Sequence, residues 1–226
     1  MRTTTHPADI AATEGRRGDG GALRTTVAVY GVLLGLAGVE HGIGELLQGP
    51  IRPDGPAFES WPDSSAFEMV GGEPAMSVVP NLLVTGVLAI VSGLAVGVWS
   101  VRFAGSHYGG PVLLGLSVLL LLVGGGFAPP LIGVLVGVAA TRIAVPARRR
   151  PPALLRTLGR GWVWFVAIGV IAYLALIPGT LVLSALTSIQ SEAVVLGLSL
   201  LSFVALFLSL AAARAHDRTS AWHREQ

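Results

Sequence analysis

The sequence predicts an all-α protein that crosses a membrane several times. Hydrophobic residues make up 52% of its 226 residues and charged residues only 12%, whereas soluble domains are about one quarter charged. Six apolar segments each approach the ~20 residues that a helix needs to cross a bilayer. All fifteen basic residues are arginine, and there is no cysteine. A disordered chain, a Schiff-base lysine and thiolate chemistry are therefore excluded.

The predicted transmembrane domain, residues 24–213, lies between two polar ends. Residues 1–23 are rich in Gly and Thr and are predicted to be a flexible cytoplasmic tail, and residues 214–226 form a second cytoplasmic tail. Residues 124–130 read Gly-Gly-Gly-Phe-Ala-Pro-Pro, in which the glycines end one helix and the prolines begin the next. That break separates the third and fourth of six spans: residues 25–47, 78–101, 108–126, 129–146, 162–187 and 193–213.

The arginine positions predict the orientation, because short cytoplasmic loops carry an excess of basic residues. Fourteen of the fifteen arginines precede the first span, follow the sixth span, or lie in the loops after the second and fourth spans, with Arg142 counted at the inner edge of the fourth span. Arg52 is the exception, in the long loop after the first span. Both termini are therefore predicted to be cytoplasmic, in the inner (plasma) membrane of a bacterium. Similar Gly-rich segments in the first and fourth spans favour a three-plus-three inverted repeat.

The loop between the fourth and fifth spans is predicted to lie on the inner membrane surface. Residues 153–160 alternate apolar and basic faces at helical spacing, which is typical of a short amphipathic helix. Its basic residues and those just before it are expected to bind anionic lipid headgroups, each contributing ~1 kcal/mol; they are Arg148, Arg149, Arg150, Arg156 and Arg160. Nucleic-acid binding is not expected, because the positive-inside rule already accounts for these arginines.

The outer part of the first span holds three ionisable residues, Glu40, His41 and Glu45. A charge at the helix centre costs ~2.5–3.5 kcal/mol in a bilayer, so such residues are functional candidates. His41 and Glu45 are four positions apart and share one helix face, whereas Glu40 lies on another face. Small residues beside Glu45 form a stripe that lets a neighbouring helix approach closely; they are Gly31, Gly35, Gly38 and Gly42.

Two interpretations of these ionisable residues remain open. In the functional one, His41 and Glu45 form a proton-linked or cation-binding pair, and Glu40 faces a different partner or cavity. In the structural one, His41 and Glu45 satisfy each other, while Glu40 is protonated or paired with Arg52. A metal site needs about three converging ligands, and because Glu40 diverges, further ligands would have to come from the outer loop. The identity of any metal is left open, and no cofactor is predicted.

The outer loop, residues 49–77, is long for a connection in a compact protein, and loops of this length are usually functional or disordered. Aromatic and acidic residues are interleaved in it, which suits a lid at the membrane surface; the candidates are Glu59, Trp61, Glu68 and Glu73. A solvated acidic loop is the alternative. Asn81 and Thr180, the latter beside a kink expected at Pro178, map to the same outer half. If these groups converge, they surround a cavity that opens to the extracytoplasmic side.

Three segments, GVEHGIGELLQG, GGEPAMSVVPNLLVTG and GGGFAPPLIGVLVGVAATRI, resemble those of a family of functionally uncharacterised bacterial multi-pass integral membrane proteins. The resemblance covers the first two thirds of the chain. It implies architecture without function, so no functional residue is carried over from it.

The function predicted first is a small permease or an ion- or proton-coupled transporter with its polar site in the outer half of the first span. The alternative is a non-enzymatic membrane scaffold or assembly partner, whose glycine stripe and outer loop bind a second copy or another membrane protein. A metal-dependent membrane enzyme ranks third, and no catalytic residue is predicted. The sequence holds no P-loop, dinucleotide fingerprint or nucleophile elbow, and aspartate is absent from every predicted span.

Overall fold

The all-α class is confirmed. The computed structural model describes residues 21–62, 64–65, 67–143, 145, 152–179, 182, 186 and 192–224. Its helices are α2 (Ala22–Gln48), α3 (Leu82–Arg102), α4 (Gly109–Leu122), α5 (Ala128–Ala140), α6 (Ala153–Arg160), α7 (Trp162–Leu174) and α9 (Glu192–Arg224). A π-helical segment, η2 (Ala175–Gly179), continues α7 and contains Pro178, where the sequence predicts a kink.

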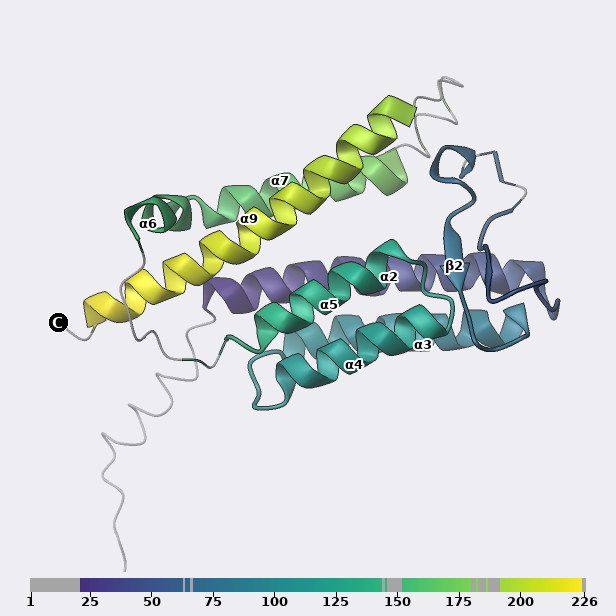
Figure 1. The fold of residues 1–226 in the computed structure, drawn as a ribbon, viewed down its shortest axis with the longest axis horizontal. Coiled ribbons are helices and arrows are strands. Elements are labelled where there is room, and N and C mark those ends of the chain that lie inside the picture. Colours follow the sequence, from purple (N-terminus) through teal and green to yellow (C-terminus); the bar gives the residue numbers. More distant parts are fainter. Residues whose placement is uncertain are drawn as a thin grey trace, which may run out of the picture.

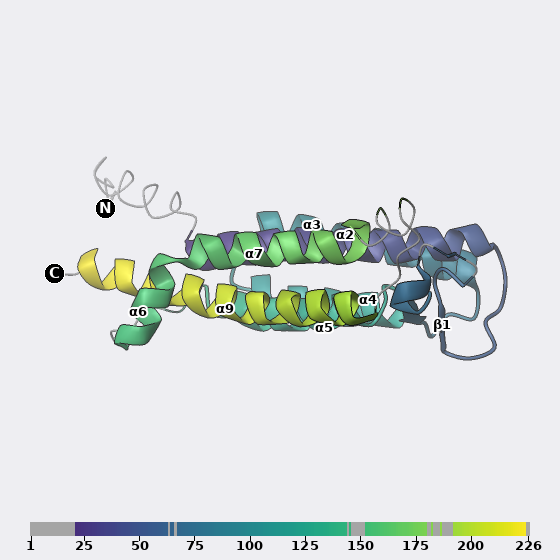
Figure 2. The same cartoon turned by 90° about the horizontal axis from the view of Figure 1, so that it is seen from above.

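Except for α6, the helices run along one long axis and form a bundle (Figure 1). Strands β1 (Ala57–Glu59) and β2 (Pro74–Met76) pair antiparallel, with Phe58 opposite Ala75, and this ribbon lies at one end of the bundle. Figure 2 shows α6 and the end of α9 at the opposite end. The start of α2 also lies there, so the described chain begins and ends on the same side of the bundle.

Four helices are long and apolar enough to cross a membrane, which supports the predicted class of membrane protein. They are α2, α3, α7 together with η2, and α9. Helices α4 and α5 have 14 and 13 residues, fewer than the ~20 that a span needs. The glycines after Leu122 end α4, and Pro129 and Pro130 lie in the first turn of α5, so the predicted break limits the length of both helices. Six spans are therefore not confirmed, and the inverted repeat stays a prediction.

Helices α2 and α3 pack closely through glycine. A Cβ on Gly35 would lie 2.5 Å from the Gly93 carbonyl oxygen, and one on Gly42 would lie 2.6 Å from the Gly86 carbonyl oxygen. Gly31 faces the side chain of Ser100 of α3, whereas Gly38 faces both Gly93 and a leucine of α4. The glycine stripe of α2 thus contacts helices of the same chain, where backbones can approach only because no side chain intervenes.

Polar side chains within the bundle find partners on the backbone or on a neighbouring helix. Thr26, Ser100 and Ser117 each donate to the carbonyl oxygen four residues earlier, at 2.7–2.8 Å. Tyr30 of α2 shares a hydrogen bond of 3.1 Å with Ser209 of α9. Such pairing is needed where water is absent, because an unsatisfied polar group in hydrocarbon costs several kcal/mol.

The last helix runs beyond the predicted end of the sixth span. Residues 214–224, predicted as part of a cytoplasmic tail, continue α9. They pack on α6, where Gly159 contacts the backbone of His216, and Asp217 accepts hydrogen bonds from the first backbone N–H groups of α2. These contacts stabilise the helical conformation of residues 214–224.

Candidate functional site

The outer loop folds back over the last turns of α2. Gln48 anchors it, since the side-chain amide donates to the carbonyl oxygens of Glu59 at 3.1 Å and Ser60 at 2.9 Å. The loop is closed on itself by a hydrogen bond of 3.1 Å from Ser60 N–H to the Glu73 carbonyl oxygen. Trp61 stacks on Phe67 with ring centroids 4.7 Å apart. These contacts bring the side chains of Ser60 and Glu73 to the polar face of α2.

His41 is buried between two loop residues, with 4% of its surface exposed. Its Nδ1 lies 3.0 Å from Oγ of Ser60, and its Nε2 lies 3.2 Å from Oε2 of Glu73. The Ser60 hydroxyl in turn donates to Oε1 of Glu45 at 3.5 Å. His41 and Glu45, predicted to form a direct pair, are thus linked through Ser60.

Glu40 completes the cluster from the neighbouring face of α2. The indole N–H of Trp61 donates to its Oε1, and the Glu40 carboxyl group also lies against that of Glu73, so the partners that the structure gives Glu40 are Trp61 and Glu73 and not Arg52. One donor atom from each of Glu40, His41 and Glu73 lies within 4.8 Å of the others. The outer loop therefore brings together the side chains that helix geometry separates.

The cluster is acidic and incompletely hydrogen-bonded. Among the described residues, Oε2 of Glu40, of Glu45 and of Glu73 is buried and accepts no hydrogen bond. Glu45 is 0% exposed and Glu73 is 5% exposed. Burial, reinforced by the hydrogen bond and charge of Glu40, raises the pKa of Glu73 to about 9. Three carboxyl groups facing one imidazole leave the site in need of protons or of another cation.

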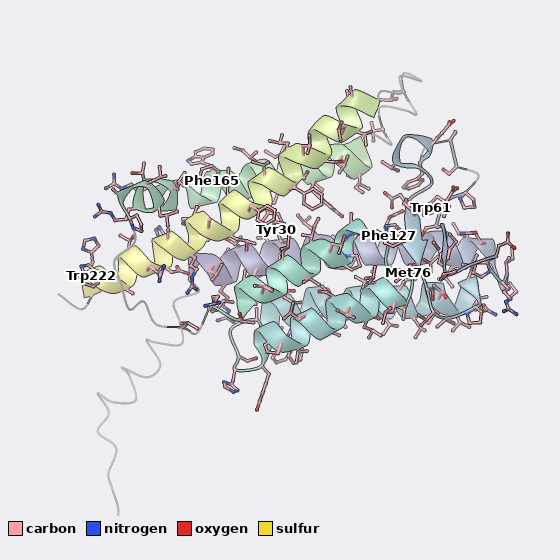
Figure 3. All side chains as sticks on the ribbon, in the orientation of Figure 1. Tyr30, Trp61, Met76, Phe127, Phe165 and Trp222 are labelled. Carbon is pink, nitrogen blue, oxygen red and sulfur yellow. The ribbon has the colours of Figure 1, made fainter. Side chains whose placement is uncertain are left out.

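The tip of the α4–α5 hairpin covers this cluster. Gly124 N–H donates to the Met76 carbonyl oxygen at 2.9 Å, which ties the hairpin to the β ribbon. A Cβ on Gly124 would collide with the Glu45 carboxyl group, and one on Gly126 would collide with the His41 ring. Figure 3 shows Trp61, Met76 and Phe127 gathered at this end of the bundle.

A cavity of about 290 Å³ adjoins the cluster between α5, α7 with η2, and α9. His41 and Glu73 line it together with Tyr173 and Ser202, and the remaining walls are largely apolar. The hydroxyl of Ser202 is buried there and has no hydrogen-bond partner among the described residues. The cavity therefore presents a few polar groups in an apolar enclosure, as small-ligand sites do.

The other residues predicted for the site lie elsewhere. Asn81 caps α3, because its side chain accepts from Val84 N–H at 3.2 Å. Glu59 and Glu68 line a separate surface hollow of about 430 Å³ on the loop. Thr180 lies outside the described residues, as do Arg148, Arg149 and Arg150, whereas Arg156 and Arg160 lie on α6.

Sequence reasoning missed Ser60 and the covering role of the hairpin tip. Ser60 sits directly before Trp61, in a loop whose fold no local periodicity specifies. The Gly-Gly-Gly segment was identified as a helix break, and its extreme lack of side chains was the one signal that something bulky packs against it.

None of the protein-family models, curated proteins or solved structures with which the chain was compared matches it. The fold and the site define it as an α-helical membrane protein with a buried cluster of carboxyl groups and one imidazole beside a cavity.

Proposed function

We propose that this protein is a small permease that binds a cation at the outer end of its helix bundle. One observation carries the proposal: the buried carboxyl groups of Glu45 and Glu73 and the half-buried one of Glu40 surround a single imidazole, beside a cavity that His41 and Glu73 line. Buried carboxylates persist when they are paired or when they bind cations. No described arginine forms an ion pair with Glu40, Glu45 or Glu73, so a bound cation or proton is what balances them.

The elements around the site support an entry from the outer side. The loop covers the cluster through Ser60, Trp61 and Glu73, and the hairpin tip covers it through Gly124 and Gly126. Helix α7 gives way to the π-helical η2 beside the cavity, and π-helical segments and prolines are common where helices bend at functional sites. A movement of these elements would connect the cavity to the outer surface.

We further propose six spans with both termini cytoplasmic in a bacterial plasma membrane. The described ends and α6 lie at one end of the bundle, which an even number of passes requires (Figure 1). Arg156 and Arg160 of α6 would then meet anionic lipid headgroups. The chain lacks cysteine, so the labelling of one introduced cysteine shows which side of the membrane that position faces. An impermeant maleimide added to intact cells should label Asp54→Cys and leave Thr157→Cys unlabelled; the reverse pattern would reject the orientation.

A scaffold that uses the glycine stripe for a partner is less well supported. All four glycines already contact α3, and Gly38 contacts α4 as well. A second protein on that surface would have to displace helices of the bundle. The outward faces of α3 and α9 are apolar, as at Val91 and Leu200. Contact with lipid is enough to account for these faces, without a partner protein.

The permease is tested by flux into proteoliposomes that hold an entrapped indicator. A panel of protons, Na⁺, K⁺, Mg²⁺, Mn²⁺ and Zn²⁺ is offered outside, with protein-free vesicles as the blank. Wild-type protein should accelerate the entry of at least one cation, and Glu73→Gln should lower that rate at least tenfold. Glu59→Gln, an exposed residue of the same loop, should leave it unchanged. Equal rates for wild type and Glu73→Gln would reject the proposal.

A further inference from the structure

We propose that Glu40, His41 and Glu73 bind one divalent transition-metal ion of the Zn²⁺ type. This inference deepens the proposed function, because it names the class of cation that the permease would carry. It rests on the geometry of three side chains and on the groups that hold them.

The three donor atoms are spaced as ligands of one ion. Zn–N and Zn–O bonds of about 2.0–2.2 Å place neighbouring ligand atoms roughly 3.4 Å apart in a tetrahedral site. His41 Nε2 and Glu73 Oε2 are 3.2 Å apart, and the whole set lies within 4.8 Å.

The hydrogen bonds of His41 assign which nitrogen faces the ion. The Ser60 hydroxyl can donate to Glu45, at 3.5 Å, and accept the Nδ1 proton of His41, at 3.0 Å, and we assign the tautomer of His41 that this arrangement requires. Nε2 then carries its lone pair toward Glu73. In metal sites the second nitrogen of a ligating imidazole usually donates its proton to a neighbouring acceptor, which fixes the orientation of the ring. Ser60, itself hydrogen-bonded to Glu45, provides that acceptor for His41.

The carboxyl groups of Glu40 and Glu73 each have an oxygen that could bind a metal ion. Trp61 occupies Oε1 of Glu40, whereas the buried Oε2 has no hydrogen-bond donor from the described residues against it. Oε2 of Glu73 is also buried, and Nε2 of His41 lies 3.2 Å from it. In the metal-free protein a proton can occupy the space between Nε2 and Oε2, and a metal ion would displace that proton and be coordinated by Nε2 and the carboxyl oxygens.

The donor set and the cavity restrict the kind of ion. One imidazole with two carboxylates suits Zn²⁺, Mn²⁺ or Fe²⁺, whereas Mg²⁺ and Ca²⁺ prefer oxygen ligands throughout and Cu⁺ prefers sulfur. His41 and Glu73 both line the cavity, so a fourth position is open to water or to an exchanging ligand. An open position suits an ion that is taken up and released.

The test is metal binding by the full chain in detergent, purified with a tag that lacks histidine and stripped with a chelator. Equilibrium dialysis with Zn²⁺ should give one ion per chain, with at least tenfold weaker binding of Mg²⁺ and Ca²⁺. Glu73→Gln and His41→Gln should each weaken Zn²⁺ binding at least tenfold, and Ser60→Ala by 10–100-fold through the lost outer-shell bond. Glu59→Gln, the matched loop control, should bind like wild type.

Binding below half an ion per chain, or the same affinity in wild type and Glu73→Gln, would overturn the site. Substitution with Co²⁺ provides a measurement on wild-type protein that does not depend on any variant folding. Visible absorption bands of a four- or five-coordinate Co²⁺ support the site, and the spectrum of the hexahydrated ion overturns it. Binding of one Zn²⁺ per chain without cation flux would support the metal site and reject the permease. Flux of another cation that does not depend on Zn²⁺ binding would support the permease and reject the metal site.

Discussion

Asp217 near the end of α9 caps the first turn of α2. Its Oδ1 accepts from Ala22 N–H at 2.7 Å, and its Oδ2 accepts from Leu23 N–H at 3.0 Å. A helix begins with N–H groups that have no partner within the helix, and a carboxylate there also complements the helix dipole. Asp217 therefore connects the two ends of the described chain.

Asp217→Ala should lower stability by about 1–2 kcal/mol, the usual cost of losing a capping carboxylate. The thermal midpoint in detergent measures the effect. The midpoint of Asp217→Asn should lie between those of Asp217→Ala and wild type, because the asparagine amide keeps one acceptor oxygen. Asp54→Asn, in the exposed outer loop, is the control. A midpoint for Asp217→Ala equal to that of wild type would show that the cap contributes nothing.

Two glycine-to-alanine changes separate close packing from helix propensity. A Cβ on Gly42 would lie 2.6 Å from the Gly86 carbonyl oxygen, whereas a Cβ on Gly115 of α4 meets no atom within 4 Å. Gly42→Ala should destabilise the protein by about 1–3 kcal/mol, because α2 and α3 must separate. Gly115→Ala should be neutral or stabilising by up to about 1 kcal/mol. Thermal midpoints of both variants below wild type by the same amount would contradict this.

Local patterns predicted the apolar helices of this protein but not the β1–β2 ribbon or the extension of α9 to Arg224, and long-range contacts decided the site. The apolar lengths located the helices, and the glycines and prolines located the break before α5 and the π-helical turn at Pro178. His41 and Glu73, by contrast, are 32 positions apart, and only the fold of the outer loop joins them. Helix geometry correctly placed His41 and Glu45 on one face, but it could not show that the Ser60 hydroxyl lies between their side chains.

The hairpin tip offers a test of whether packing over His41 shapes the site. Gly126 has φ +76° and a Cβ there would meet the imidazole, whereas Gly71 has φ +65° and open space around it. Alanine costs about 1 kcal/mol at either position, because L residues disfavour positive φ. Both Gly126→Ala and Gly71→Ala should therefore lose stability, but Gly126→Ala should also weaken Zn²⁺ binding at least tenfold by displacing the ring. Equal Zn²⁺ affinities in equilibrium dialysis would show that the tip does not position His41.

The stability of the metal-free protein should fall as the pH rises. The pKa of Glu73 is raised from 4.5 to about 9 by burial, assisted by Glu40, and the other titratable groups facing it are His41 and Tyr173. Because the folded state holds this proton more tightly than the unfolded state does, the stabilising contribution is complete below about pH 4.5 and is lost as the pH rises to about 9. Thermal midpoints measured in chelator across that window should decline for wild type and for Glu59→Gln. Glu73→Gln cannot ionise, so its profile should be flatter; a decline as steep as that of wild type would place the titration on another group.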